Sequence, residues 1–355
     1  MNIEHFLLNT SPNWMMEQTE LDIIISTRIR LARNLVDCPF PISFSEQEAK
    51  KVEENLMNTL LSQPDEHHQF SYFSMAELSV LQKQLLVEKH LISPTLAKKD
   101  IGSSVFLTHD ESVSIMVNEE DHIRIQCLSS GLKLMETYMQ ARKIDEILQR
   151  QMPIAFHEKY GYLTSCPTNV GTGLRASVML HLPALTMSKQ MPLLIQMMTR
   201  LGMVVRGIYG EGSENLGNVY QVSNQVTLGK TEEEILQELQ DVVEQVIEKE
   251  KLARKQLLTH SPIILEDRLS RSLGTLKFAK VLTSEEAAVC LSNVRLGIQL
   301  GLLPKIDQKI LSECMLLIQP GVVQQYAGAT LHPAERDYYR AKLLQERLQS
   351  IDDVV

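Results

Sequence analysis

Residues 103–127, SSVFLTHDESVSIMVNEEDHIRIQC, contain three short runs in which apolar side chains alternate with other residues. The polar breaks THDES and NEED separate these runs. A period of two with polar breaks is typical of neighbouring antiparallel strands. The sequence therefore predicts an antiparallel sheet at the centre of the fold. The alternating residues are Val105 and Leu107, then Val113, Ile115 and Val117, then Ile123, Ile125 and Cys127.

Segments on both sides of this stretch extend the pattern. Further strands are expected in residues 21–34, 174–182, 203–212 and 218–229. Helical periods occupy residues 45–62, with Ser45 as the N-cap, about 75–91, the stretch that ends near Gln151, a Met-rich stretch before Gly202, and 231–252. The expected fold class is α+β, an antiparallel β-sheet flanked by helices.

The strand signal fades beyond about Leu257. The remaining segments have helical period, with a Thr283/Ser284 cap and with Pro304, Pro320 and Pro333 between them. We therefore expect a helical C-terminal domain after the sheet domain. The predicted division is an N-terminal lead-in at 1–20, a catalytic domain at 21–255 and a helical domain at 256–355.

The bulk composition limits the classes of function. The chain has 355 residues, of which 44% are hydrophobic, and its formal net charge is -9. That charge argues against broad nucleic-acid binding, which relies on excess Lys and Arg. No apolar run approaches the roughly 20 residues of a membrane helix, and the N-terminus does not resemble a signal peptide, so a cytoplasmic location is expected. Most of the five cysteines are expected to be buried thiols, and only Cys166 lies in a glycine-rich loop.

Five arginines lie on or next to the strand-like segments. Arg28 and Arg30 are two residues apart, so a strand would direct both to one face. A single strand arginine is usually an exposed residue or one half of a salt bridge. Five together suggest a shared anion, because guanidinium binds phosphate oxygens bidentately and stays charged. A triphosphate is the natural partner of the set Arg28, Arg30, Arg124, Arg175 and Arg206.

Two acidic segments could complement the arginines. Glu119, Glu120 and Asp121 lie at a strand junction, and Glu211 lies in a turn flanked by glycines. Each alone is more often a solvated loop charge. Near a phosphate-binding pocket, a carboxylate can orient a cationic nucleophile and accept its proton.

Four motifs carry a resemblance to a known family. Residues 166–183, CPTNVGTGLRASVMLHLP, resemble the signature of the phosphagen (guanidino) kinases, the family of creatine kinase and arginine kinase. STRIRLARN at 26–34, VNEEDHIRI at 117–125 and RGIYGEGSE at 206–214 are similar to the other blocks of that family and occur in the same order. The resemblance covers roughly residues 20–250. It implies the antiparallel sheet shared with glutamine synthetase, which agrees with the period-two pattern.

The resemblance also implies roles for individual residues. Glu120 and Glu211 would grip the guanidinium of the acceptor, with Glu120 as the base, and Cys166 would lie against that guanidinium. ATP is the implied phosphate donor, and Mg²⁺ would be held mainly by ATP oxygens and water, without dedicated protein ligands. The implied nucleotide-binding residues are Ser26, Thr27, Arg28, Ile29, Arg30, His90, Arg124, Arg175, Ala176, Ser177, Val178, Met179, Arg206, Gly207, Ile208, Tyr209, Gly210 and Glu211.

The sequence departs from the small-molecule kinases of the family in three ways. Those kinases carry a helical domain before the STRIR block, whereas here 25 residues precede Ser26. Met179 stands where the family usually has a histidine, which puts one nucleotide contact in doubt. The C-terminal helical domain is an addition. An acceptor site without the closing domain suits a bulky substrate, and the resemblance to bacterial protein-arginine kinases implies an arginine side chain in a protein as that substrate.

This arrangement resembles the bacterial protein-arginine kinases of the Gram-positive stress response. In that group, the motif Arg-Asp-x-x-Arg-Ala is an allosteric phosphoarginine site, and the present chain has RDYYRA at Arg336, Asp337, Tyr338, Tyr339, Arg340 and Ala341. Two arginines four apart share a helix face and could clamp one phosphate. An amphipathic helix with i,i+4 polar contacts is the alternative.

The same resemblance implies a set of partners. These are protein substrates that include a heat-shock repressor, a zinc-binding activator protein and the Clp unfoldase-protease, together with a homodimeric state. Two other functions remain open from the sequence. One is a phosphagen kinase for a small guanidine, and the other is a phosphoarginine-binding adaptor without catalysis.

Overall fold

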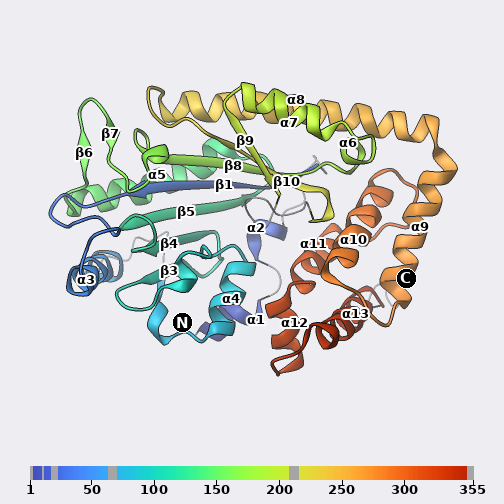
Figure 1. Cartoon of the computed structure of the whole chain (residues 1–355), viewed down its shortest axis with the longest axis horizontal. Helices are drawn as coiled ribbons and strands as arrows, with labels where there is room; N and C mark the ends of the chain where they lie inside the picture. Colours follow the sequence, from blue (N-terminus) through green and yellow to red (C-terminus); the bar gives the residue numbers. More distant parts are fainter. Residues whose placement is uncertain (1–2, 10–11, 17–22, 63–69, 208–215, 350–355) are drawn as a thin grey trace. The chain divides into compact units, whose positions relative to one another are not determined.

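The structure is a computed structural model that describes residues 3–9, 12–16, 23–62, 70–207 and 216–349 (Figure 1). Contacts between Cα atoms divide the chain into two compact units. Unit 1 contains residues 1–14, 26–178 and 223–240, and unit 2 contains residues 15–25, 179–222 and 241–355. The sequence-based boundaries at 20/21 and 255/256 stay a prediction.

The predicted antiparallel sheet is present. Within the described residues, eight strands form one sheet in the order β2-β3-β4-β5-β1-β8-β10-β9, and two short strands form a separate hairpin, β6-β7. The strands are β1 (Ile24–Arg33), β2 (Phe70–Ser74), β3 (Ser104–Thr108), β4 (Val113–Val117), β5 (Ile123–Ser130), β6 (Phe156–His157), β7 (Gly161–Tyr162), β8 (Leu174–His181), β9 (Met203–Gly207) and β10 (Val219–Asn224).

The stretch from 103 to 127 forms β3, β4 and most of β5, as its alternation predicts. Val105 pairs with Met116 and Ile115 pairs with Ile125, both in antiparallel register. Every residue of β3 and β4 is buried, including Ser104 and Ser114. The polar positions of these strands therefore face protein rather than solvent, and Ser114 Oγ accepts a hydrogen bond from Gln126 Nε2 at 3.0 Å.

The helices follow the predicted periods with local differences. The helix expected at 75–91 is divided into a 3₁₀ turn, η1 (Met75–Glu77), and a helix that starts at Val80 behind a Ser79 capping box. Ser45 and Thr283 cap their helices as predicted, since Ser45 Oγ accepts from Glu48 N and Thr283 Oγ1 from Glu286 N.

The described helices of the chain's first 260 residues are α1 (Ile3–Leu8), α2 (Asn13–Met16), α3 (Glu46–Ser62), α4 (Val80–Glu88), α5 (Leu134–Gln151), α6 (Pro183–Met187), α7 (Met191–Arg200) and α8 (Glu232–His260). In unit 1, α5 packs on β5 and α3 on β2, while in unit 2 α7 packs on β9. Three 3₁₀ turns, η2 (Leu96–Lys98), η3 (Pro167–Asn169) and η4 (Leu216–Asn218), connect elements.

The C-terminal part of unit 2 is helical, as predicted. The segment α9 (Pro262–Phe278) was not identified from the sequence as a separate helix, and the others are α10 (Ser284–Gln299), α11 (Gln308–Leu317), α12 (Pro320–Ala327) and α13 (Pro333–Gln349). Helix α13 contacts α9, α11 and α12, and α10 contacts α9 and α11. Leu269, Leu276, Val294 and Leu344 are fully buried in these helices.

Two further sequence expectations concern composition. Cys127, Cys290 and Cys314 are buried free thiols, while Cys38 and Cys166 are half-buried. Among the helices that the structure describes, none is both long enough and apolar enough to span a bilayer.

Candidate active site

Three of the predicted arginines share one face of the sheet. In the antiparallel pair β1–β5, Arg28 lies opposite Leu128, Arg30 opposite Gln126 and Ala32 opposite Arg124. Residues directly opposite each other have their side chains on the same face. Arg28, Arg30 and Arg124 therefore project from one face, and Arg175 comes from β8, the strand on the other side of β1.

These four guanidinium groups repel one another. Burial, and then the charges of Arg124 and Arg175, lower the pKa of Arg28 to about 10. Burial, and then Arg28, Arg124 and Arg175, lower the pKa of Arg30 well below its usual value, while Glu119 raises it. In the described part of the chain, the Nε atom of Arg30 is buried without a hydrogen-bond partner. A polyanion such as the triphosphate of ATP would relieve both the repulsion and the missing hydrogen bond.

Carboxylates from the β4–β5 turn meet this cluster. Arg124 Nη1 lies 2.5 Å from Glu119 Oε2, and Arg124 Nη2 lies 3.0 Å from Glu120 Oε2. Glu119 is buried, and it accepts from Ser93 Oγ at 2.5 Å and from the Glu120 N–H at 3.1 Å. The Glu120 side chain is 42% exposed. Glu119 thus holds Arg124 in place, and the Glu120 carboxylate is partly open to solvent.

His90 lies beside the arginine face in an unusual backbone conformation. Its φ is 60°, and its carbonyl oxygen accepts from Gln126 Nε2 at 2.8 Å. Gln126 pairs with Arg30 across β1 and β5, so this hydrogen bond ties His90 to the arginine face. Burial and then the charge of Arg28 lower the pKa of His90 to about 4. The imidazole is therefore neutral at physiological pH.

A buried carboxylate joins the turn that carries Glu120 to the loop that carries Cys166. Asp121 Oδ1 accepts from Ser165 N and from Asn34 Nδ2, both at 2.6 Å. Asn34 Oδ1 in turn accepts from the His122 N–H at 2.8 Å. Asn34 lies inside the STRIRLARN motif, but its role was not identified from the sequence. Two sequence features could have identified Asn34: its place in a recognised motif, and an amide side chain that can both donate and accept hydrogen bonds.

The glycine-rich loop around Cys166 is held against residues 227 and 228. Thr227 Oγ1 donates to the carbonyls of Thr168 and Val170, and Cys166 Sγ lies 3.0 Å from Thr168 Oγ1. Gly171 has a φ of 114°, and a Cβ atom there would lie 2.2 Å from the Thr227 carbonyl oxygen. Only glycine permits this close approach, which positions η3 and with it the half-buried Cys166.

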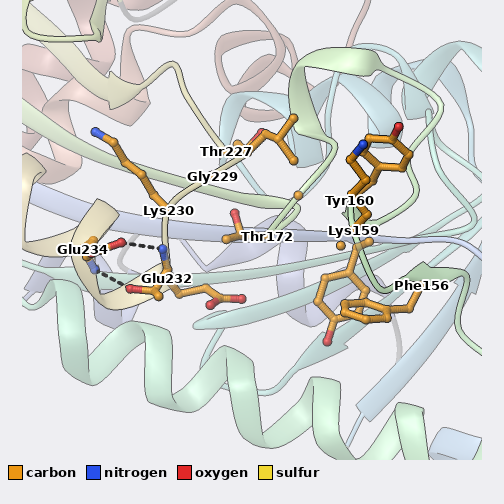
Figure 2. Close-up of a pocket in the computed structure, with 14 residues that line it drawn as sticks. Phe156, Lys159, Tyr160, Thr172, Thr227, Gly229, Lys230, Glu232 and Glu234 are labelled. Carbon is orange, nitrogen blue, oxygen red and sulfur yellow. Dashed lines mark hydrogen bonds between the residues drawn. The ribbon is translucent and has the colours of Figure 1, made fainter.

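A pocket of about 390 Å³ lies behind this loop. Figure 2 shows Thr172 and Thr227 of the loop region, Phe156 and Tyr160 of the β6–β7 hairpin, and Lys230, Glu232 and Glu234 at the start of α8 around it. Among the predicted catalytic and nucleotide-binding residues that the structure describes, none lines this pocket. It is therefore a feature beside the candidate active site rather than its centre.

Several of the predicted nucleotide-binding residues make hydrogen bonds within the protein. Thr27 Oγ1 donates to the Gly131 carbonyl at 2.6 Å and accepts from Lys133 N at 3.1 Å, and Ile29 is fully buried. The side chains of both residues occupy the face opposite Arg28 and Arg30, so any contact with a nucleotide would use their backbone. The Ala176 N–H donates to Asn224 Oδ1 at 2.8 Å and is already engaged.

Other predicted site residues belong to different parts of the chain. Ser26, Ser177 and Val178 are buried on β1 and β8 of unit 1. Met179, Arg206 and Gly207 belong to unit 2. Ile208, Tyr209, Gly210 and Glu211 lie outside the described residues. The roles expected for these residues stay predictions.

The RDYYRA motif lies in the first turns of α13. Arg340 is 2% exposed, and it donates to the carbonyls of Ile318 and Leu282, each at 2.8 Å, and to Asp337 Oδ1 at 2.5 Å. Arg336 is half-buried and Tyr338 is 51% exposed. Arg340 therefore joins α13 to the ends of neighbouring segments, and a phosphate clamp by Arg336 and Arg340 stays a prediction.

Comparison with known proteins identifies the family. Residues 51–253 match the family described as ATP:guanido phosphotransferase, C-terminal catalytic domain. The chain belongs to the guanido phosphotransferase family. Residues 262–354 of this guanido phosphotransferase also match the domain described as the protein-arginine kinase McsB C-terminal domain.

Full-length relatives resemble the whole of this guanido phosphotransferase. A protein-arginine kinase of Bacillus mycoides (strain KBAB4) is 50% identical over 351 residues, which cover 98% of this chain and 99% of the relative. A protein-arginine kinase of Geobacillus sp. (strain WCH70) is 49% identical, with coverage of 98% and 97%. The expected family and its protein-arginine kinase branch are confirmed.

Solved structures support the fold alone. A lombricine kinase superposes with a TM-score of 0.59 at 23% identity, over 70% of each chain. A duplicated taurocyamine kinase from Schistosoma mansoni, with bound components of a transition-state analogue, gives a TM-score of 0.61 at 21% identity and covers 91% of this chain and 50% of its own. The predicted fold class, an antiparallel sheet flanked by helices with a helical C-terminal part, is confirmed.

Proposed function

We propose that this guanido phosphotransferase is a protein-arginine kinase, which transfers the γ-phosphate of ATP to arginine side chains of proteins. The observation that carries the proposal is the cluster of Arg28, Arg30, Arg124 and Arg175, in which burial and the neighbouring arginine charges lower the pKa values of Arg28 and Arg30. The near full-length similarity to protein-arginine kinases supports a protein arginine as the acceptor.

In the proposed reaction, the arginines bind the phosphates and neutralise the charge that spreads over the transferring phosphoryl group. The reaction needs positioning and electrostatic stabilisation rather than a covalent enzyme intermediate, so fixed guanidinium groups on strands suit it. Mg²⁺ would be held mainly by ATP oxygens and water and would supply further charge neutralisation. Arg206 is proposed to complete the phosphate-binding set.

The acceptor arginine must lose a proton as its nitrogen attacks phosphorus. We assign this step to Glu120, whose carboxylate is partly exposed and lies next to Arg124. Glu211 and Cys166 are proposed to hold the acceptor guanidinium in line with the γ-phosphate. Asp121 is a positioning residue, because it connects the turn of Glu120 with the loop of Cys166. The nitrogen–phosphorus bond forms as the bond to the ADP oxygen breaks.

The remaining proposals extend from the family resemblance. The RDYYRA motif is proposed as a phosphoarginine site, and Arg336, the half-buried member, is placed to make the first contact. A zinc-binding activator protein, a heat-shock repressor, the Clp unfoldase-protease and a second copy of the chain are proposed partners. A cytoplasmic location fits these partners and the free thiols.

A labelling experiment tests the function. The protein is incubated with Mg-ATP and either free arginine or an arginine-rich protein, and acid-labile phosphoarginine is measured by mass spectrometry. Label on the protein is expected. Label on free arginine alone would indicate a small-guanidine phosphagen kinase, and no label with either acceptor would indicate a non-catalytic adaptor.

A variant tests the assigned base. Glu120→Gln keeps the shape of the side chain but cannot accept the proton, so the rate is expected to fall by about 10²–10⁴-fold. Glu77→Gln changes an exposed glutamate of η1 and serves as the matched control with wild-type rate. A normal rate in Glu120→Gln would remove Glu120 as the base.

A further inference from the structure

Residues 3–9, which precede the first strand, are anchored in unit 1. Helix α1 lies beside α4 (Figure 1). Lys89 Nζ donates to the Phe6 carbonyl and to Glu111 Oε1, the latter at 2.7 Å, and Asn9 Nδ2 donates to the same Glu111 oxygen at 2.9 Å. Lys89 and Glu111 are 1% and 0% exposed. The buried ion pair of Lys89 and Glu111 therefore holds Phe6 and Asn9 next to Lys89, the residue that precedes His90.

A second anchor follows at Trp14 in α2. The Trp14 ring packs edge to face against the His90 ring, with centroids 6.0 Å apart and an interplanar angle of 61°. Trp14 is 4% exposed, and in the described part of the chain its indole Nε1 is buried without a hydrogen-bond partner. Buried N–H groups are nearly always hydrogen-bonded. The indole N–H of Trp14 is therefore a donor for which a bound molecule could supply the acceptor.

The charges around Trp14 indicate which part of a nucleotide would supply this acceptor. His90 is neutral at physiological pH, because burial and the charge of Arg28 lower its pKa to about 4. Trp14 and His90 thus form an uncharged aromatic pair, whereas Arg28 and Arg30 lie on a cationic face of the sheet. A nucleotide has the same two parts, an aromatic nucleoside and an anionic phosphate chain.

We propose that Trp14 is a nucleotide-binding residue, whose indole N–H donates to an acceptor on the nucleoside half of ATP while its ring and His90 line that half of the site. The N-terminal segment then belongs to the binding site rather than being only a lead-in to the catalytic domain. The inference rests on the proposed function only in taking ATP as the donor, and it does not depend on the identity of the acceptor.

Fluorescence tests the proposal directly, because Trp14 is the one tryptophan in the sequence. The full-length protein is titrated with ADP and separately with inorganic tripolyphosphate, and binding of each is measured by calorimetry. ADP is expected to change the emission of Trp14, while tripolyphosphate, which lacks a nucleoside, binds with little change. No change at saturating ADP, or an equal change with tripolyphosphate, would overturn the proposal.

A variant separates a binding role from a structural one. Trp14→Phe keeps an aromatic ring but removes the donor, so its Kd for ADP is expected to rise about five- to tenfold while its Kd for tripolyphosphate is unchanged. Tyr72→Phe is the matched control, because it removes the hydrogen bond from another aromatic ring of unit 1 to Glu53. Its Kd for ADP is expected to equal that of the wild type.

Two outcomes decide between the roles. If folded Trp14→Phe binds ADP as tightly as the wild type, or loses affinity for ADP and tripolyphosphate equally, Trp14 has no specific role in binding the nucleoside. Failure of the arginine-labelling experiment would leave these binding measurements unaffected, so the proposed function and this inference can fail independently.

Discussion

Strand β1 carries two arginines with opposite surroundings. Arg33 is 2% exposed, and its Nε and Nη2 atoms contact both oxygens of Asp145 at 2.7–3.1 Å, while its guanidinium lies 3.4 Å above the Tyr162 ring. Arg30, three residues earlier, faces other arginines and has a buried Nε without a partner in the described residues. Arg33 is buried as a whole, and Arg30 is half-buried with a buried Nε. Arg33 has a carboxylate within hydrogen-bond distance, whereas Arg30 is surrounded mainly by other arginines, and this difference separates the arginine proposed to bind phosphate from the one that supports the fold.

The same distinction applies to unit 2. Arg254 donates to Glu250 Oε1 at 2.9 Å, and Glu250 also accepts from the N–H groups of Ala184 and Leu185. Arg340 is surrounded by two carbonyls and a carboxylate. Each of these arginines is paired with a carboxylate, as Arg33 is, although Arg254 Nη2 is buried without a partner in the described residues. Substitution of either arginine is therefore expected to lower mainly the stability of the fold.

The largest effect is expected at Arg30. Arg30→Met should lower the rate of phosphoryl transfer by about 10⁴-fold, because it removes a cation from the phosphate site. Its free energy of unfolding should be unchanged or slightly higher, since the substitution relieves repulsion among arginines. Rate measurements and denaturant unfolding check both parts, and a large loss of stability would erase the contrast with Arg33.

Arg33→Met should show the reverse behaviour. It leaves Asp145 buried without its partner, so the free energy of unfolding is expected to fall by about 3–5 kcal/mol. The double variant Arg33→Met/Asp145→Leu should recover most of that loss, because the unpaired charge is gone. Urea unfolding of the two variants measures this. A double variant as unstable as the single one would show that the packing on Tyr162, rather than the ion pair, is what matters.

Ligand binding sharpens the comparison further. Tripolyphosphate at about 100 times its Kd should stabilise the wild type by about 2.7 kcal/mol, because it binds the folded state alone. Arg30→Met should lose most of this stabilisation and Arg33→Met should keep it. Thermal melting with and without the anion provides the measurement, with chloride at equal ionic strength as the control. Equal stabilisation of both variants would place the anion elsewhere.

The smallest effect concerns pH. Burial, and then the charges of Arg295 and Arg254, hold the pKa of His181 well below 6.5. The unfolded chain therefore binds a proton near pH 6.5 that the folded chain does not, and stability falls as the pH drops below that value. The loss is at most about 1.4 kcal/mol per pH unit for this group.

His181→Gln tests this origin of the pH dependence. The slope of unfolding free energy between pH 6.5 and 5 should be shallower in the variant than in the wild type, and the remaining slope should include His90, which titrates near pH 4 when folded. Identical slopes would show that His181 contributes nothing. Urea titrations at several pH values make the comparison.

Much of the fold could be predicted because its signals are local. The alternation in residues 103–127 and the caps Ser45 and Thr283 concern neighbouring residues, and the structure has the corresponding strands and helix starts. Helix α9 was missed as a separate element, although Ser261 followed by Pro262 is a helix-start signal; in the structure the Ser261 side chain makes no capping hydrogen bond. Full burial of β3 and β4 was also not anticipated, because alternation alone does not reveal a second covered face.

The candidate site was predicted less completely. Glu120, Cys166 and the arginines of β1, β5 and β8 were identified from motifs. Asn34, Asp121 and Trp14 were not assigned roles, because their importance depends on partners far away in the chain. The hydrogen bond from Asn34 to Asp121 spans 87 positions, and no local pattern predicts such a pair.

The sequence by itself determined that Arg28 and Arg30 share a face of β1 and that Arg33 projects from the other, since side chains alternate along a strand. Only the tertiary structure decided which of these arginines is neutralised. Asp145, which pairs with Arg33, is 112 positions away on α5, and Arg124 and Arg175, which repel Arg30, come from two other strands. Charge neutralisation depends on distance in space, and the folded sheet sets that distance.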